Sequence, residues 1–564
     1  MPDLIFPVLR AVTRRAKTNF IRKTRALEAV QEQFLLEMLR SHQDTELGQK
    51  FGIGNITTVG QFRDRVPILP YSSYDPYTER IAKGEQNILN PDPVVYVSLT
   101  SGSTGKQKQI PVTRRYQKNL GKPNLAAFGF AIAALEARSK QQDPPRKFRF
   151  GKLLTTNGIN VQGVTSGGID YGPVTVGSIR SSHLLYRPLL AMPYDTLSIA
   201  DSLSRHYVCL LFALKNPSVG GVGTNFPMLV LRTCGYLEKY ASDLIGDLRS
   251  GAIASWVKIE PKLRYQLEQK LGANPQRATQ LENILNTEGR LTPKLAWPDL
   301  SFIVTAMGGT SDFYFERFPD YFGDTPIFGG VYGSAEGTFG VSYDLNQAGT
   351  ILSIDTGFYE FIPEEDWDQE NPKTLLPSEV EIGQSYRMLV TSYSGIYRYD
   401  IGDIVEILGF YEQTPIIVFR HRRGGLLSAT TEKTTEFHAT QVMQALSQEF
   451  NLDLDDFCIT LSDNEFPSRY LVNIELADGQ TLDDPQKFLH RFEYWLGEFN
   501  NPYTTVRSSE VPPPRLQILA PGSFAIVRQR QLDKGMSDAH LKFPHISEDR
   551  GFLQGLNVVQ KIEL

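Results

Sequence analysis

Apolar residues recur along the chain with two different patterns, and the change between them predicts how the chain is organised. In the first 250 residues, apolar positions at helical spacing predict a helix over 8–46. Helices are also expected over 117–138 and over the Leu- and Ala-rich stretches 190–214 and 228–250. After residue 300, short β-like runs separated by Gly and Asp predict a series of strands. Strands and helices mixed in this way favour an α/β (mixed α+β) fold with several sheets.

The residues after Gly425 show a pattern of their own. It predicts a helix over 434–449, a hairpin formed by 457–461 and 469–475, a second helix over 484–499 and a strand over 515–519. Because Gly424 and Gly425 interrupt the chain just before these elements, we place a domain boundary there. We therefore expect a large N-terminal domain over residues 1–424 and a small α+β domain over 425–564.

Composition narrows the class of protein. Of the 564 residues, 41% are hydrophobic and 21% charged, which is typical of a globular chain and excludes a mostly disordered one. A net charge of −5 argues against a general nucleic-acid-binding protein, and three cysteines without CxxC spacing argue against a disulfide framework or a cysteine zinc site. The longest apolar run, 125–135, is too short to span a membrane. We expect a cytoplasmic protein without an integral membrane segment.

A segment rich in Gly, Ser and Thr follows directly after the β-like run 94–99 and is the strongest candidate for chemistry. Its candidate phosphate-binding residues are Thr100, Ser101, Gly102, Ser103, Thr104, Gly105 and Lys108. Glycines let backbone N–H groups approach phosphate oxygens, hydroxyls add donors, and lysines add positive charge. The segment does not satisfy the Walker A pattern, and a flexible turn would have the same composition.

Two later segments contain residues suited to a nucleotide. The first combines the aromatic ring of Tyr332 with the carboxylate of Glu336, an oxygen ligand of the kind that magnesium prefers beside a nucleotide phosphate. The second places Asp403 after a glycine, where its carboxylate could accept hydrogen bonds from a ribose diol. Each segment also has a structural explanation when it is taken alone. The segment with Tyr332 and Glu336 could be a tight turn between strands, and Asp403 could form an Asx-turn before a strand.

The order of these segments resembles that of the adenylate-forming superfamily, which includes acyl-CoA synthetases, luciferases and the adenylation domains of peptide synthetases. Further stretches narrow the resemblance: 66–81, 358–361, 393–403, 427–436 and 522–524. With them, the chain is similar to the plant auxin-responsive Gretchen Hagen family, the acyl acid amido synthetases, from about residue 25 to about residue 548. The resemblance implies a large adenylate-forming domain followed by a small, mobile C-terminal domain.

The resemblance also implies roles for particular residues. The nucleotide would be bound by the phosphate loop with Lys108, by the turn Tyr332-Gly333-Ser334, and by Asp403 and Arg422. The implied catalytic residues are Thr104, Glu336 as a ligand of Mg²⁺, and Lys542, which would enter the site from the small domain. Candidates for contacts with the acyl acid are Met307, Gly308 and Tyr359, although core packing would explain Met307 and Gly308 equally well.

The activity that the resemblance implies is ATP-dependent amide formation. A small carboxylic acid would be adenylated with release of pyrophosphate, and an amine, by family likeness an amino acid, would then displace AMP. Two alternatives stay open: transfer to coenzyme A or a carrier thiol, and a non-catalytic nucleotide-binding sensor. The sensor is motivated by two departures from the family pattern, Ala335 in place of a hydroxyl residue and Asp400 in place of arginine.

Overall fold

The computed structural model describes residues 2–564 apart from 101–107, 142–147, 149, 310, 368, 370, 423–425, 430–431, 433, 464, 466–467, 501–502, 505–506, 508–510 and 534–542. The chain forms two compact units. Unit 1 comprises Met1–Gly308, Tyr314–Ile401 and Val405–Val418, and unit 2 comprises Gly309–Phe313, Gly402–Ile404 and Phe419–Leu564. The predicted domain boundary at Gly424 and Gly425 lies outside the described residues and stays a prediction.

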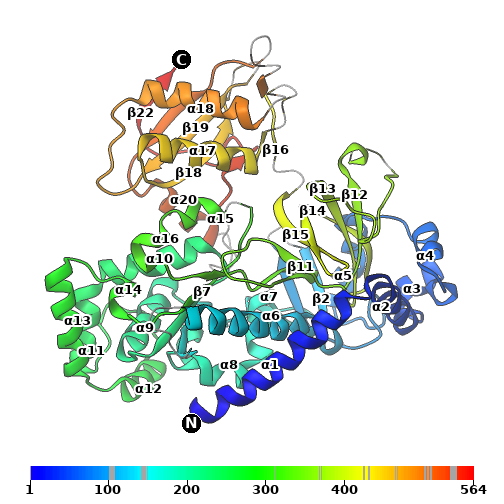
Figure 1. The fold of residues 1–564 in the computed structure, drawn as a ribbon, viewed down its shortest axis with the longest axis horizontal. Helices are drawn as coiled ribbons and strands as arrows, with labels where there is room; N and C mark the ends of the chain where they lie inside the picture. The colour runs from blue at the N-terminus through cyan, green and yellow to red at the C-terminus, as the bar shows by residue number, and fades with distance from the viewer. Residues whose placement is uncertain are drawn as a thin grey trace. The chain divides into compact units, whose positions relative to one another are not determined.

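Three sheets organise unit 1, which confirms the expected mixed α/β class (Figure 1). One four-stranded sheet has the order β2 (Lys108–Thr113), β1 (Val94–Thr100), β5 (Asp170–Pro173) and β4 (Gly163–Val164). A second has the order β3 (Lys152–Leu154), β6 (Val219–Gly223), β7 (Phe302–Val304) and β8 (Ile327–Phe328), with every neighbouring pair parallel. The largest is a seven-stranded sheet with the order β12 (Phe358–Pro363), β13 (Ser385–Ser392), β14 (Ile396–Tyr411), β15 (Thr414–Arg422), β11 (Thr350–Leu352), β10 (Gly337–Ser342) and β9 (Val331–Ser334).

Helices cover these sheets. The long helices α1 (Pro2–Thr24) and α6 (Arg114–Gln141) run side by side (Figure 1). The others of seven residues or more are α2 (Leu27–His42), α4 (Val59–Arg65), α5 (Asp75–Ala82), α7 (Val174–Ser181), α9 (Ser202–Lys215), α10 (Pro227–Lys239), α11 (Ala241–Ser250), α12 (Pro261–Leu271) and α13 (Pro275–Glu288). Helix α6 confirms the predicted helix over 117–138, whereas α12 and α13 were not predicted.

Two helices that were predicted as continuous are divided or shortened in the structure. The stretch 8–46 forms α1 and α2, because the side chain of Gln31 turns α2 onto the seven-stranded sheet by donating to the backbone oxygens of Ile354 and Gly357 at 2.6 and 2.8 Å. The stretch 190–214 is an α-helix only from Ser202, where Asp201 caps the first turn by accepting from the N–H of Ser204 at 2.9 Å.

Unit 2 is an α+β module. Its five-stranded sheet has the order β21 (Ile546–Ser547), β18 (Leu454–Leu461), β19 (Tyr470–Leu476), β20 (Arg515–Leu519) and β22 (Val558–Glu563), and a two-stranded ladder joins β16 (Leu426–Leu427) to β17 (Thr434–Thr435). Its helices of eight residues or more are α17 (Glu436–Phe450), α18 (Pro485–Phe499) and α20 (Ser523–Asp533). The antiparallel pair β18–β19, the helices α17 and α18, and the strand β20 confirm the elements predicted for this part of the chain.

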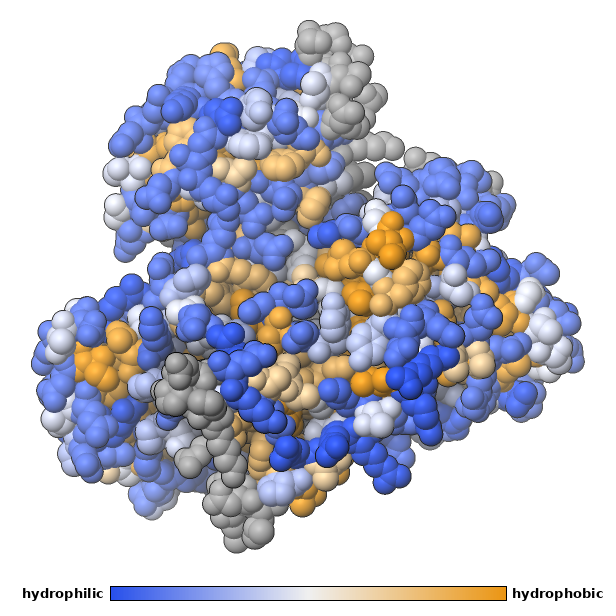
Figure 2. Space-filling view, in the orientation of Figure 1, coloured by the Kyte–Doolittle hydropathy of each residue, from blue (hydrophilic) through white to orange (hydrophobic). Residues whose placement is uncertain are grey.

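Polar residues dominate the molecular face in Figure 2, and apolar side chains gather over the β14–β15 end of the seven-stranded sheet. On β14, Leu408 and Phe410 are exposed. Within the described ranges, no helix combines the length and the apolar character needed to cross a bilayer. The three cysteines, Cys209, Cys234 and Cys458, are free and buried.

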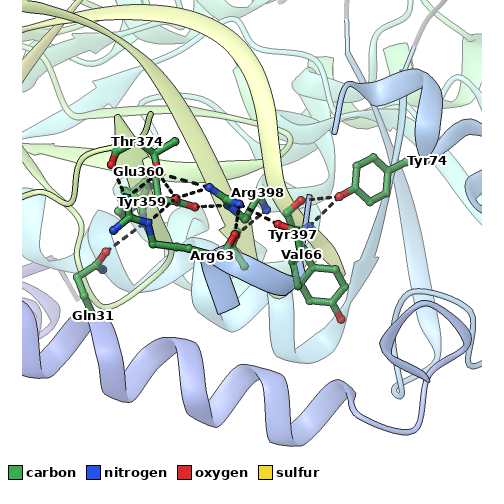
Figure 3. A network of polar contacts seen from close by, with 10 residues as sticks. Gln31, Arg63, Val66, Tyr74, Tyr359, Glu360, Thr374, Tyr397 and Arg398 are labelled. Atoms are coloured by element: carbon green, nitrogen blue, oxygen red, sulfur yellow. Dashed lines mark hydrogen bonds and ion pairs between the residues drawn. The ribbon is translucent and has the colours of Figure 1, made fainter. Parts of the chain in front are cut away.

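A buried ion pair fixes α4 and the segment after it to the seven-stranded sheet (Figure 3). Arg398 on β14 donates to both carboxylate oxygens of Glu360 on β12 at 2.8 Å, and the two side chains are only 8% and 1% exposed. The other terminal nitrogen of Arg398 donates to the backbone oxygens of Arg63 and Val66 at 2.7 and 2.8 Å. Thr374 adds a hydrogen bond to Glu360 at 2.7 Å. The guanidinium is therefore surrounded by acceptors, as a buried charge requires.

Replacing Arg398 by methionine should destabilise the protein by about 3 kcal/mol, because Glu360 would lose its bidentate partner in a buried position. The measurement is the urea unfolding transition of each variant. Arg25→Met is a suitable control, because the ion pair of Arg25 with Glu412 is exposed (64% and 40%) and should contribute less than about 1 kcal/mol. Equal effects of the two substitutions would contradict the anchoring role.

Candidate functional site

The predicted phosphate loop connects the two strands of a β-hairpin. Thr100 is the last residue of β1, Lys108 is the first of β2, and the two are paired across the antiparallel ladder. Five of the predicted loop residues lie outside the described residues: Ser101, Gly102, Ser103, Thr104 and Gly105. The hairpin thus fixes both ends of the loop, whereas the roles of these five residues stay predictions.

Aromatic residues hold the side chain of Lys108. Its ammonium group donates to the hydroxyl of Tyr399 at 2.8 Å and lies 5.7 and 5.5 Å from the ring centres of Tyr71 and Tyr399. The hydroxyl of Tyr71 also accepts from the backbone N–H of Gln109 at 2.6 Å and donates to its oxygen at 2.9 Å. Burial raises the pKa of Tyr71 to about 12, so this phenol remains protonated at neutral pH. A positive charge is therefore fixed at the start of β2, directly after the predicted phosphate loop.

The turn between β9 and β10 brings Ser334 and Glu336 together. The Ser334 hydroxyl donates to Oε2 of Glu336 at 2.6 Å and accepts from the Glu336 N–H at 3.1 Å. Glu336 is only 3% exposed, and its Oε1 has no hydrogen-bond partner in the described part of the chain. In the same turn, the half-buried ring of Tyr332 packs edge-on against Phe339, while Gly333 is exposed. The carboxylate of Glu336 is therefore oriented and still has an oxygen available for a cation.

Two hydroxyl groups from distant elements fix the backbone of this turn. Tyr116 on α6 donates to the backbone oxygen of Ala335 at 2.8 Å, and Ser392 on β13 donates to that of Glu336 at 3.0 Å. Tyr116 is fully buried, and burial raises its pKa well above the usual value for tyrosine. The side chain of Ala335 belongs to the surrounding core. Neither Tyr116 nor Ser392 was predicted at this turn, because neither is near Glu336 in sequence.

Among the described residues, no group of three or more His, Cys, Asp or Glu side chains could hold a metal ion on its own. A magnesium ion beside a nucleotide commonly uses only one or two protein carboxylates. The available oxygen of Glu336 is a ligand atom of the kind that such an ion uses.

In unit 2, two residues predicted to bind nucleotide are in direct contact. Arg422, at the end of β15, donates from Nε to Oδ1 of Asp403 on β14 at 2.7 Å. The Asp403 side chain is 3% exposed and that of Arg422 is 35% exposed. The guanidinium of Arg422 therefore orients a nearly buried carboxylate while remaining accessible itself.

The structure places the other predicted residues in different settings. Met307 and Gly308 follow β7, and Met307 is half-buried. Tyr359 is 1% exposed, its hydroxyl donates to the backbone oxygens of Thr338 and Ser353 at 3.4 and 3.3 Å, and burial raises its pKa. Its surroundings are those of a core residue. Lys542 lies outside the described residues.

Comparison with known proteins identifies the family. The GH3 family N-terminal domain matches residues 16–327, the GH3 family central domain matches 350–422, and the GH3 family C-terminal domain matches 437–551. The chain belongs to the GH3 family. This confirms the Gretchen Hagen resemblance that the motifs predicted.

Curated GH3 relatives align with most of the chain. The 4-substituted benzoates-glutamate ligase GH3.12 of Arabidopsis thaliana is 26% identical over an alignment of 565 positions, which covers 94% of this chain and 95% of that protein. The jasmonoyl–L-amino acid synthetase JAR4 of Nicotiana attenuata is 28% identical over an alignment of 473 positions, which covers 79% of this chain and 78% of that protein. These relatives are acid–amino acid ligases, the class of enzyme that the motifs predicted.

A solved structure shows the same fold. The AtGH3.15 acyl acid amido synthetase in complex with 2,4-DB superposes with a TM-score of 0.85 at 22% identity, covering 100% of this chain and 97% of that one. This likeness shows that the chain shares the fold of that synthetase.

Removing the Tyr116 hydroxyl should disturb the position of Glu336. We expect Tyr116→Phe to raise, by about threefold or more, the Mg²⁺ concentration that half-saturates acid-dependent exchange of pyrophosphate into ATP, because the Ala335–Glu336 backbone loses a donor. Each substitution should cost about 1 kcal/mol in the free energy of unfolding. Tyr359→Phe is the matched control, since it removes another buried hydroxyl and should leave the Mg²⁺ midpoint unchanged. An identical midpoint in both variants would contradict the positioning role of Tyr116.

Proposed function

We propose that this chain is an ATP-dependent acid–amino acid ligase that acts in the cytoplasm. The observation that carries the proposal is the alignment of 94% of the chain with a GH3 acid–amino acid ligase. The arrangement around Glu336 and Lys108 supports it, because one supplies an oriented carboxylate and the other a fixed positive charge beside the loop predicted to bind phosphate. The proposed substrates are a small carboxylic acid, ATP and an amino acid.

The proposed reaction has two steps. A carboxylate oxygen of the acid attacks the α-phosphorus of ATP, and the bond to the bridging oxygen breaks, so that pyrophosphate leaves with the electron pair. The amino group then attacks the carbonyl carbon of the acyl-adenylate, the bond to the AMP oxygen breaks, and the nitrogen loses a proton to give the amide. Negative groups must approach each other in the first step, so preorganised positive charge and hydrogen-bond donors lower the barrier most.

The residues that we propose for these two steps are the ones that the sequence segments predicted for nucleotide binding and catalysis. Thr104, the neighbouring loop residues and Lys108 would bind phosphate oxygens, while Tyr332 would contact adenine. In the small domain, Lys542 would offset the charge that develops in adenylation. Asp403, oriented by Arg422, would bind the ribose. Glu336 would hold Mg²⁺, which supplies positive charge beside the phosphates when bound.

The direct test is acid-dependent exchange of labelled pyrophosphate into ATP, followed by mass spectrometry of the products. With mixed acids and amino acids we expect exchange and an amide product. Thioesters formed with coenzyme A instead would contradict amide transfer. ATP binding without exchange over a broad panel of acids would contradict catalysis altogether.

Substituting Lys542 by alanine should lower the exchange rate by about 100-fold, because its charge acts in the transition state of adenylation. ATP affinity should change by less than about twofold, because other residues bind the nucleotide in this proposal. Lys561→Ala provides a control, since Lys561 is an exposed lysine on β22. An exchange rate that is the same in both variants would remove Lys542 from the mechanism.

A further inference from the structure

The parallel sheet β3-β6-β7-β8 ends in polar residues. Because its strands are parallel, their carboxyl ends lie at one edge, which is where open α/β sheets bind ligands. Asn157 follows β3 by three residues, Asn225 follows β6 by two, and Thr305 follows β7 directly. The edge of the sheet is thus polar where a site for a purely hydrocarbon acid would be expected to be apolar.

Hydrogen bonds connect these residues into a chain. The side-chain nitrogen of Asn157 donates to the side-chain oxygen of Asn225 at 3.2 Å, and the side-chain nitrogen of Asn225 donates to the hydroxyl of Thr175 on α7 at 3.1 Å. All three residues are half-buried, so the chain is partly open to solvent. The side-chain oxygen of Asn157 has no hydrogen-bond partner in the described part of unit 1 and can accept one from a ligand.

A buried arginine fixes the loop that carries Asn157. Arg205 on α9 is 6% exposed and donates to the backbone oxygens of Thr156 and Ile199 at 2.9 Å each. Gly158 packs against the same guanidinium, and a Cβ added there would meet its carbon at 3.4 Å. On the neighbouring strand, the backbone oxygen of Asn225 accepts from the N–H of Ala306 at 3.3 Å. The two amide side chains therefore project from backbones that are held in place, as a recognition site requires.

Two hydroxyl groups at the same edge support a functional reading. The side-chain oxygens of Thr305 and of Ser342, next to Gly329 after β8, are buried and have no hydrogen-bond partner within the described ranges. Buried hydroxyls are nearly always paired in proteins. Two buried hydroxyl groups that are unpaired among the described residues, at one edge of a sheet, are what we expect where residues are kept for binding a ligand and not for stability alone.

We propose that Asn157, Asn225 and Thr175 form a polar subsite that selects acids with a neutral hydrogen-bonding substituent, such as a hydroxyl, remote from the carboxylate. This inference rests on the proposed ligase function and names the class of its acyl substrate. The three side chains are uncharged, so they favour a neutral group over a second carboxylate. The half-buried side chain of Met307, at the end of β7, gives the same edge an apolar surface for the body of the acid.

The test compares acids in pairs that differ by one hydroxyl, for example hexanoate with 6-hydroxyhexanoate and 3-phenylpropanoate with 3-(4-hydroxyphenyl)propanoate. We expect kcat/KM for pyrophosphate exchange to favour the hydroxylated member of at least one pair by about tenfold or more, because a site built to pair with a hydroxyl rejects the analogue that lacks it. Asn157→Leu and Asn225→Leu should each abolish that preference. Asn160→Leu, on the same loop but exposed, should retain it.

The outcomes separate this inference from the proposed function. Exchange that favours the hydroxylated member of none of the pairs, or a preference that survives both leucine substitutions, overturns the polar subsite and leaves the ligase function standing. Altered selection of the amino acid alone would assign the three residues to the amine and also overturn the inference.

Calorimetric measurement of acid binding tests the subsite if no acid supports exchange. Binding of the hydroxylated acid that is lost in Asn225→Leu would then support the subsite and contradict the ligase, and equal or absent binding of both members would overturn the subsite as well.

Discussion

The geometry around the predicted phosphate loop depends on the buried ion pair between Arg398 and Glu360. Arg398 adopts a left-handed backbone conformation (φ 42°), which is uncommon for a residue with a side chain, and its guanidinium holds that conformation by binding Glu360 and the end of α4. The chain on both sides is fixed as well, because the hydroxyl of Tyr74 donates to the oxygen of Tyr397 and Leu69 pairs with Tyr399. Tyr399 then presents its hydroxyl to Lys108. A buried ion pair often costs about as much in desolvation as it returns, so its value here is in fixing the position of this strand.

The segment Tyr397 to Asp403 shows which roles could be predicted from the sequence and which could not. Its order of residues predicted nucleotide binding, which stays a prediction, and the structure shows Asp403 as a carboxylate bound by Arg422. The first three residues have structural roles that were not predicted from the sequence. Tyr397 and Tyr399 are buried, and Arg398 anchors α4. The partners of Arg398 lie 38 and 335 positions away, and no local pattern of residues encodes contacts at such separations.

For the fold as well, local patterns could be predicted from the sequence, whereas contacts between distant residues could not. Elements with a strong local pattern were predicted closely, and β20 has the bounds that its sequence indicated. The predicted helix over 8–46 was wrong in its continuity, because the break at Arg25 and Ala26 follows from where α2 packs and from the contacts of Gln31, which are more than 300 positions away. The polar edge formed by Asn157 and Asn225 was also missed, since two asparagines 68 positions apart form no motif until parallel strands bring them together.

Long-range contacts also explain the two departures from the family pattern. At position 335 the side chain packs in the core, while the turn is held through the backbone oxygens that Tyr116 and Ser392 bind, so a side-chain hydroxyl at this position is not needed to orient Glu336. Asp400 is likewise part of the structure: its N–H donates to the oxygen of Leu69 at 3.1 Å and its carboxylate lies 3.5 Å from Nε of Arg387. Both residues thus have structural roles that are compatible with a working site. The two departures therefore no longer favour a non-catalytic sensor. If this chain and its relatives differ in substrate, the proposed polar edge of the parallel sheet is a better candidate for the cause.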